Sequence, residues 1–411
     1  MKIVHAADLH IDSPLKGLEH YETAPVERAR DATRKAFANI IDLCLEQRAD
    51  LLLIAGDIFD SDWRDYHTGL FFVAQLSRLM EVGTRVFLVR GNHDCRNEVT
   101  RSLRWPRHVH EMSARAAETV LLEDLGVAVH GRSYPQRSVE ENLVPDYPEP
   151  RPGLLNIGLL HANVHGVPGH DNYAPCSRDD LVAKGYGYWA LGHVHQHLTL
   201  NEFPHIVYPG CSQGRSIREP GPKGCVLVTA SAGEIESVEF TECGVMRWES
   251  VEVPLGEEAR TVDDALDLCE EAVRRVADRA TTPLALRFTI AGASEAHASL
   301  AQDRDRVVAR IRQIPIDLGI DAWIEKVVVA TRCPPDLSEA DGLIARTRAR
   351  LRELAAGGDL EPLMASLRVL DKAAGAELRD AGLDLTGPAA VRALLPQVEG
   401  VLLASLMGGL S

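Results

Sequence analysis

Short apolar runs of strand length recur along about the first 250 residues of the chain, and each run ends at a cluster of polar residues. Amphipathic stretches with the spacing of helices separate several runs, as around Phe37–Leu45 and Leu70–Leu79. This alternation predicts βαβ units built on parallel strands. The predicted strands are Lys2–Ala7, Leu51–Ala55, Arg85–Val89, Val127–His130, Leu155–Leu160 and Tyr188–Leu191.

The pattern changes after Pro254–Arg260, an acidic and turn-prone segment that predicts a domain boundary. A helical stripe at Ala265–Val276, a strand at Leu284–Ile290, a helix near Val307–Ile311 and a strand at Glu325–Ala330 follow it. Beyond Pro335 the apolar spacing is wholly helical. We therefore predict a first domain over residues 1–253, a small α/β capping domain over 261–332 and a helical C-terminal region over 336–411.

Composition narrows the classes of protein that fit this chain. With 411 residues, 45% apolar and 25% charged, the chain has the usual make-up of a multidomain globular protein and not of a disordered one. A net charge of −16 disfavours nucleic-acid binding by bulk positive charge. A polyanionic substrate would therefore need local cations.

The cysteines and the apolar runs indicate in which cellular compartment the protein is expected. The eight cysteines are scattered, with no C-x-x-C pair, which predicts reduced structural thiols and not a zinc ribbon or a disulfide framework. The sequence shows no signal peptide, and no apolar run approaches the roughly 20 residues that span a bilayer. We expect a cytoplasmic protein without membrane association.

Polar clusters stand at the carboxyl ends of the predicted strands, the edge at which open α/β sheets form ligand sites. Their carboxylate, amide and imidazole groups suit borderline divalent ions such as manganese, iron or zinc better than calcium or magnesium alone. The clusters are Asp8-Leu9-His10, Gly56-Asp57, Gly91-Asn92-His93-Asp94, His161 and Gly192-His193-Val194-His195.

These side chains are too many for one ion, so we predict two divalent ions, manganese first, with iron, zinc or magnesium as alternatives. One ion would be held by Asp8, His10 and His195, and the other by Asn92, His161 and His193, with Asp57 bridging. Two neighbouring ions can activate water and neutralise the charge that grows on a transferred phosphoryl group.

His93 is left over from this ligand set. A histidine that faces the substrate without binding metal can protonate a leaving oxygen, and an adjacent carboxylate such as Asp94 can orient it. His93 and Asp94 are therefore the candidate catalytic residues of a phosphoesterase.

Taken in order, the five clusters resemble the motifs of the calcineurin-like metallophosphoesterases. The stretches Asp8–Pro14, Gly56–Asp60 and Tyr188–His193 are more similar to the SbcD-type bacterial DNA repair nucleases, in particular their YhaO-like branch. The similarity continues through Tyr208–Arg215, except that it predicts Asn at position 211, where this chain has Cys211.

The resemblance implies a four-layer α/β/β/α fold with a small cap. It also implies manganese-dependent exonuclease cleavage of DNA phosphodiesters and an SbcC-like coiled-coil ATPase as partner. Two other functions stay open: a phosphatase or cyclic-nucleotide phosphodiesterase, and a non-catalytic, metal-stabilised scaffold of an ATPase complex. The long C-terminal part disfavours the first, and His93 with the full ligand set disfavours the second.

Several residues near the motifs allow two interpretations. Arg90, Arg215 and Arg218 are candidate phosphate contacts, although a lone arginine is more often a solvated charge. Asp60 is either a hydrogen-bond partner of a ligand or a turn residue. Among the remaining histidines, His5 is predicted to lie in the core, and His165 and His197 are predicted loop or strand residues.

The C-terminal tail is predicted to form a helix that is apolar on more than one side. Such a helix needs more than one neighbour. It would dock on the ATPase or on a second copy of the chain, or pack against Leu360–Leu370. Its apolar residues are Leu394, Leu395, Val398, Val401, Leu402 and Leu406, with Leu403 and Met407 on another side.

Overall fold

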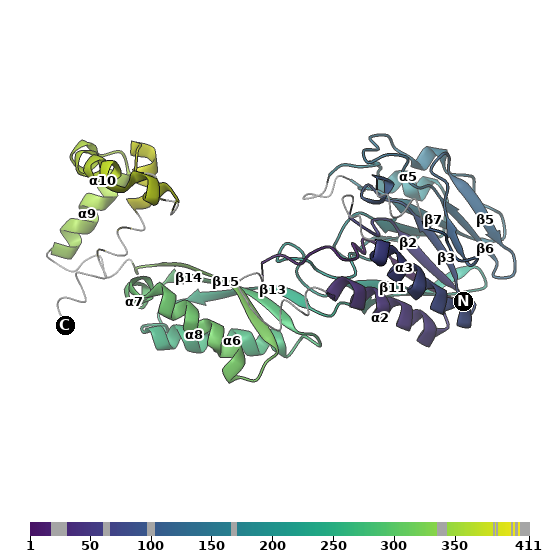
Figure 1. Ribbon diagram of the computed structural model, residues 1–411, viewed down its shortest axis with the longest axis horizontal. Helices are drawn as coiled ribbons and strands as arrows, with labels where there is room; N and C mark the ends of the chain where they lie inside the picture. Colours follow the sequence, from purple (N-terminus) through teal and green to yellow (C-terminus); the bar gives the residue numbers. More distant parts are fainter. Residues whose placement is uncertain are drawn as a thin grey trace. The chain divides into compact units, whose positions relative to one another are not determined.

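The apolar runs of the first part of the chain form two six-stranded sheets that pack face to face (Figure 1). The chain divides into two compact units, Met1–Glu249 with Ala280–Ala285, and Ser250–Arg279 with Leu286–Ser411. The computed structural model of the chain describes residues 1–17, 31–60, 66–96, 103–165, 171–334, 343–380, 383, 385–395, 398 and 402.

The first sheet has the strand order β12-β11-β1-β2-β3-β4. Its parallel strands are β1 (Lys2–Ala6), β2 (Leu51–Ala55), β3 (Arg85–Val89) and β4 (Val109–Glu111). The hairpin of β11 (Gly224–Ser231) and β12 (Glu234–Glu242) joins antiparallel to β1. The strands predicted from the first three apolar runs are confirmed as β1, β2 and β3. These runs are apolar because nearly all of their side chains are buried.

The second sheet has the order β5-β6-β7-β8-β10-β9. Its parallel strands are β6 (Val127–Gly131), β7 (Leu155–His161), β8 (Tyr188–Gly192) and β10 (His205–Tyr208). Antiparallel strands β5 (Glu118–Leu122) and β9 (Leu198–Glu202) close its two edges. The predicted runs correspond to β6, β7 and β8.

Helices cover the outer face of each sheet and complete the predicted α/β/β/α arrangement. On the first sheet lie α2 (Ala32–Gln47) and α3 (Tyr66–Arg78), whose Phe37 and Phe72 pack with Leu52 and Ile54. On the second lies α5 (Arg178–Ala183), packed with Trp189 through Leu181. Short 3-10 turns occur at Leu79–Glu81, Asp94–Arg96 and Val144–Asp146.

The second unit contains a three-stranded sheet of order β13-β14-β15. Its elements are β13 (Arg247–Leu255), α6 (Val262–Ala277), β14 (Leu284–Ala293), α7 (His297–Gln302), α8 (Arg304–Asp317) and β15 (Ala322–Arg332). The boundary predicted after residue 253 falls inside β13. Pro254 is tolerated there because β13 is an edge strand, where a missing N–H costs no ladder hydrogen bond.

The described residues of the C-terminal region include the helices α9 (Leu343–Ala355) and α10 (Glu361–Asp380). Leu395 packs with Leu354, Leu360 and Met364, so for this residue the predicted packing within the chain is observed. Val398 and Leu402 are 40% and 39% exposed. The predicted apolar positions Val401, Leu403, Leu406 and Met407 lie outside the described residues.

None of the helices in the described parts of the chain is long and apolar enough to cross a membrane. None of the eight cysteines, all of which the structure describes, forms a disulfide bond, and seven of them are buried. The predicted reduced thiols are therefore consistent with the packing of the core.

His5 lies inside β1 without solvent exposure, which confirms it as a core histidine. Its Nδ1 is 3.0 Å from the Tyr188 hydroxyl and its Nε2 is 3.1 Å from the Leu191 carbonyl oxygen. Burial lowers the pKa of His5 from 6.5 to about 3. Between these two values the unfolded chain holds a proton that the folded chain does not, so stability is lost as the pH falls.

We expect the free energy of unfolding of the metal-free chain to fall more steeply between about pH 6 and pH 4 than that of the His5→Gln variant. The difference in slope should reach up to about 1.4 kcal/mol per pH unit, which is the contribution of one proton that only the unfolded chain binds. Denaturant titrations of both chains at several pH values measure this difference. Equal slopes in the native and His5→Gln chains would show that His5 is not buried neutral.

Candidate metal centre

The predicted ligands lie together at the carboxyl ends of five parallel strands, β1, β2, β3, β7 and β8. All of them are buried except His195, whose side chain is 20% exposed. Asp8 and His10 follow β1, Asp57 follows β2, Asn92 follows β3, His161 ends β7, and His193 and His195 follow β8. Strand order alone therefore brings together residues that are far apart in the sequence.

The ligand atoms approach one another as two overlapping groups. Asp8, His10 and His195 form one group, and Asp8, Asp57 and His161 form another, with their ligand atoms within 4.8 Å in each. Asn92 joins the second group, since its Oδ1 is 3.0 Å from His161 Nε2. The ring of His193 also lies here, 5.2 Å from the His161 ring between centroids.

Asp57 stands between the two groups. Its Oδ2 is 3.9 Å from Nε2 of His10 and 3.6 Å from Nε2 of His161. The backbone N–H of His93 donates to its Oδ1 at 3.0 Å. A carboxylate that lies near histidines of both groups is able to bridge two ions, and this role of Asp57 stays a prediction.

The backbone at the strand ends is bent to direct these side chains. Asp8, His10, Asp57 and His193 all have positive φ, at 51°, 41°, 52° and 106°. Residues other than glycine rarely adopt this region, and such strain concentrates at functional sites. The N–H of His193 donates to both carboxylate oxygens of Asp8, at 3.1 and 2.9 Å, and holds two of the bent segments together.

Two motif glycines are needed because backbone passes close to the ligands. A Cβ at Gly91 would lie 2.2 Å from Asp57 Oδ1, and one at Gly192 would lie 1.9 Å from the Ala55 carbonyl oxygen. Both distances are far below van der Waals contact. Any side chain at these positions would therefore displace a ligand or the strand behind it.

The ring nitrogens are arranged as metal ligands require. Nδ1 of His10 is 2.7 Å from Asp60 Oδ1, and Nδ1 of His161 is 2.9 Å from the Ala55 carbonyl oxygen. An acceptor at Nδ1 fixes the proton there and leaves the Nε2 lone pair directed inward. Nε2 of His10 is buried without a hydrogen-bond partner. The residues thus fit two divalent ions.

Electrostatics favours the same conclusion. Burial, and next the charge of Asp57, raises the pKa of Asp8. Burial acts on Asp57 in the same direction, but His161 and His10 outweigh it and lower the pKa of Asp57 to about 2. Burial, followed by Arg215, lowers the pKa of His10 to about 4. Neutral imidazoles beside crowded carboxylates are what a divalent cation binds.

His93 lies beside the centre, with its ring 5.0 Å from the His10 ring between centroids. The structure corrects the expectation that Asp94 orients it. Asp94 is buried and accepts backbone N–H groups of Ile58, Phe59 and Gly91 at 2.9, 3.0 and 3.0 Å, so it ties the loops after β2 and β3 together. The carboxylate near His93 is Asp60, 3.6 Å from Nδ1.

Two of the three arginines predicted to bind phosphate are engaged with carboxylates. Arg90 Nε lies 2.6 Å from Glu111 Oε1, and Arg215 Nη2 lies 2.7 Å from Glu219 Oε1. Arg218 is exposed and stays a candidate phosphate contact.

Glu219 is a site residue that the sequence analysis missed. Its Oε1 is 2.7 Å from Nδ1 of His195, so it orients this ligand as Asp60 orients His10. The sequence offered one indication of this role, because Glu219 follows Arg215 by four residues, a spacing at which the two side chains can pair. Asp60 is confirmed as a partner of a ligand. His165 is exposed, and His197 packs on Phe240, so both are loop or strand residues as predicted.

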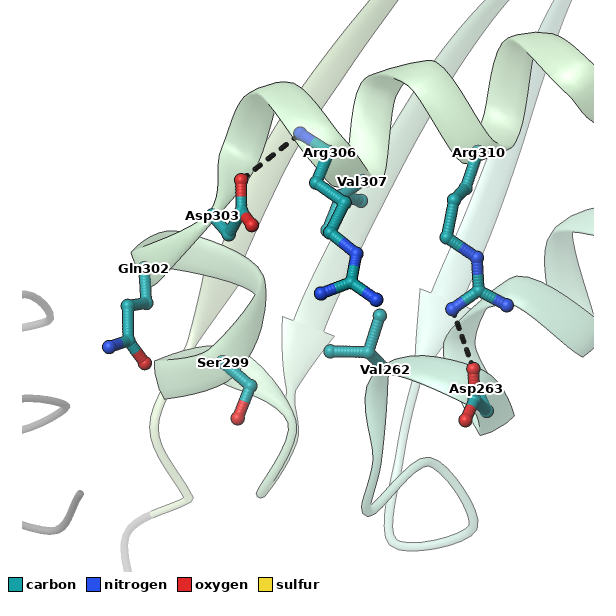
Figure 2. Close-up of a pocket in the computed structure, with 8 residues that line it drawn as sticks. All are labelled: Val262, Asp263, Ser299, Gln302, Asp303, Arg306, Val307 and Arg310. Carbon is teal, nitrogen blue, oxygen red and sulfur yellow. Dashed lines mark hydrogen bonds and ion pairs between the residues drawn. The ribbon is translucent and has the colours of Figure 1, made fainter.

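A separate cavity of about 600 Å³ lies in the second unit, where α6 and α8 approach each other (Figure 2). Arg310 bonds Asp263 across it at 2.7 Å, and Arg306 points into it. None of the predicted site residues lines this cavity.

Comparison with known proteins places the chain in a family. The model described as "Calcineurin-like phosphoesterase" matches residues 1–197. The model described as "Metallophosphoesterase YhaO, middle domain" matches residues 248–332, a range that begins within β13. The chain is 34% identical over 296 residues to the uncharacterized metallophosphoesterase YhaO of Bacillus subtilis, covering 71% of this chain and 72% of that protein.

Two more distant similarities were found. The chain is 25% identical over 299 residues to the DNA double-strand break repair protein Mre11 of Methanopyrus kandleri, covering 67% of this chain and 62% of that protein, which is less than two thirds of its length. Among solved structures, TT1561 of Thermus thermophilus matches with 12% identity and a TM-score of 0.34, over 58% of this chain and 98% of that one. So low a TM-score supports no inference about function.

We expect Asp57→Asn to abolish binding at both metal sites, because Asp57 Oδ2 lies 3.9 Å from Nε2 of His10 and 3.6 Å from Nε2 of His161. Asp8→Asn should weaken mainly one site. Metal content per chain, measured by mass spectrometry after dialysis against manganese, distinguishes the two variants. A fully loaded Asp57→Asn chain would exclude Asp57 as the bridge.

Gly91→Ala is expected to weaken manganese binding by about 10- to 100-fold, the range typical of changes behind metal ligands. The added methyl group would displace the carboxylate of Asp57. Calorimetric titration measures the effect. Gly387→Ala is the control, since nothing lies within 4 Å of that position and affinity should not change. Native affinity in Gly91→Ala would contradict the close approach of the two loops.

Proposed function

The chain belongs to the calcineurin-like metallophosphoesterases, among which it is similar to YhaO, and from this premise we propose that it is a metal-dependent DNA nuclease of the SbcD type. It would hydrolyse phosphodiester bonds as an exonuclease in DNA repair. The similarity to a DNA double-strand break repair protein supports this proposal.

Seven side chains would hold the two ions, with manganese as the first choice. When bound, such ions neutralise charge on a phosphate ester and activate water for attack on it. The donors are a mixture of imidazole nitrogen and carboxylate or amide oxygen, which suits manganese. The set is Asp8, His10 and His195 on one side, Asn92, His161 and His193 on the other, and Asp57 between them.

His93 is the observation that carries the proposal. Its side chain is 32% exposed, compared with 20% for His195, 1% for His10 and 0% for His161, so it is the most exposed of these four histidines. A sugar hydroxyl is a poor leaving group and needs a proton as the P–O bond breaks. His93 would supply that proton, and Asp60 Oδ1 lies 3.6 Å from its Nδ1.

The negative charge of the chain indicates that a partner helps to bind DNA. The chain carries a net charge of −16, and two arginines near the centre are paired with carboxylates. DNA therefore needs cations from elsewhere, which fits an SbcC-like coiled-coil ATPase that presents DNA ends to the centre. A second copy of the chain is the alternative partner, and we propose that the assembly works in the cytoplasm.

Purified chain with manganese, incubated separately with labelled duplex DNA, single-stranded DNA and bis-p-nitrophenyl phosphate, tests the proposal. Metal-dependent shortening of at least one DNA substrate is expected. Hydrolysis of the small esters alone, with DNA intact even when the ATPase is added, would favour a small-molecule phosphodiesterase. No activity on any of these substrates, with both ions bound, would favour a non-catalytic scaffold of an ATPase complex.

We expect His93→Ala to retain both ions and to cleave DNA about 10²- to 10⁴-fold more slowly, the range for a lost general acid. Bis-p-nitrophenyl phosphate should be affected much less, because its leaving group needs no proton. His110→Ala is a matched control, since His110 is also a partly exposed histidine of the first unit that pairs with a carboxylate. Equal losses on both substrates would mean that His93 binds the phosphate or shapes the site.

A further inference from the structure

Arg215 lies between two carboxylates next to the metal centre. Its Nη2 is 2.7 Å from Oε1 of Glu219 and its Nε is 3.3 Å from Oε2 of the same residue. Its Nη1 lies 3.8 Å from Asp60 Oδ1 and 3.4 Å from the Ser13 hydroxyl. The guanidinium fork is therefore occupied by protein groups, and the side chain is only 18% exposed.

Both of these carboxylates orient metal ligands. Asp60 accepts from Nδ1 of His10 at 2.7 Å, and Glu219 accepts from Nδ1 of His195 at the same distance. The backbone N–H of Arg215 also donates to Glu219 Oε2 at 2.7 Å. A continuous chain of contacts thus runs from His10 through Asp60, Arg215 and Glu219 to His195.

The other ligand histidines are oriented differently. His161 Nδ1 is held by the carbonyl oxygen of Ala55 at 2.9 Å, and His193 Nε2 by the carbonyl oxygen of Asp171 at 2.7 Å. Both acceptors are neutral backbone groups. Carboxylate support is therefore seen on His10 and His195, the two histidines that group with Asp8.

We propose that Arg215 is a positioning residue for one of the two metal sites, the one formed by Asp8, His10 and His195. It acts through Asp60 and Glu219, and its Nη2 also lies 3.2 Å from Nδ1 of His195, without touching the ion or the substrate. This proposal rests on the two-metal centre and not on DNA as the substrate.

The physical basis is the cost of leaving two mostly buried carboxylates without the cation that lies between them. Without Arg215, Glu219 would turn toward water and release the ring of His195, which is the most exposed of the ligand side chains. A lysine would restore the charge, but it is a point charge that cannot form the fork that bonds Glu219 and reaches Asp60 together.

Manganese titration of the metal-stripped full chain, by calorimetry and by electron paramagnetic resonance of free Mn²⁺, tests the proposal. Arg215→Gln is expected to weaken one of the two sites by about 10- to 100-fold, as for other residues that orient metal ligands, and to leave the other at native affinity. Arg215→Lys should fall between the native chain and Arg215→Gln. Glu219→Gln, which keeps an acceptor oxygen for His195, should weaken the same site less than Arg215→Gln.

Arg132→Gln is the matched control. Arg132 also lies between two carboxylates of the first unit, 3.0 Å from Asp146 and 3.9 Å from Glu141, and is 11% exposed. This variant should bind both ions with native affinity, and thermal unfolding of each metal-free variant shows whether the fold is intact.

Three results would overturn the proposal. Native affinity at both sites in Arg215→Gln with a raised KM for a phosphodiester would make Arg215 a phosphate contact, as the sequence alone predicted. Equal weakening in Arg215→Gln and Arg132→Gln would indicate general destabilisation. Equal weakening of both sites in Arg215→Gln would exclude a role confined to one site. The last two results are read from metal binding alone, and the first needs only a small phosphodiester as substrate, so none of them depends on whether the chain cleaves DNA.

Discussion

The arrangement of the candidate metal centre depends on two carboxylates, Asp8 and Asp57, that are buried in one place. Each is almost completely removed from water, and burial together with the charge of Asp57 raises the pKa of Asp8. Such crowding is costly unless cations neutralise it. The surrounding imidazoles do not supply that charge, because burial lowers the pKa of His10 and of His161. They supply lone pairs instead, so neutralisation is left to divalent ions.

The polar groups behind the ligands follow from the same constraint. A neutral imidazole is a directed ligand only if its second nitrogen is held, and each ring has an acceptor there, either a carboxylate such as Asp60 or a backbone oxygen such as that of Ala55. His93 stands outside this arrangement, beside the ions and in reach of solvent. A histidine so placed is available for proton transfer, which separates the binding of metal from the chemistry.

The sequence predicts what depends on local pattern and fails where contacts are long-range. Strands such as Leu51–Ala55 are apolar on both faces and could be recognised, whereas β12 alternates between charged and apolar residues and was missed. The ligands could be recognised because Asp, Asn and His recur at the carboxyl ends of several strands, the edge at which such sheets form ligand sites. Glu219 could not, because 24 residues separate it from His195 and only the fold brings them together. The position of Asp94 next to His93 suggested a pair, but its oxygens are taken by backbone N–H groups.

The ligands come from strands of both sheets, β1 to β3 in one and β7 and β8 in the other. Bound ions would therefore hold the two sheets together, and they would stabilise the folded chain by about 2.7 kcal/mol when an ion is present at 100 times its dissociation constant. Scarcity of the metal would then shorten the lifetime of the protein as well as silence it, since a chain without ions opens more often and is exposed to proteolysis. The supply of divalent ions would control the abundance of this enzyme and its activity together.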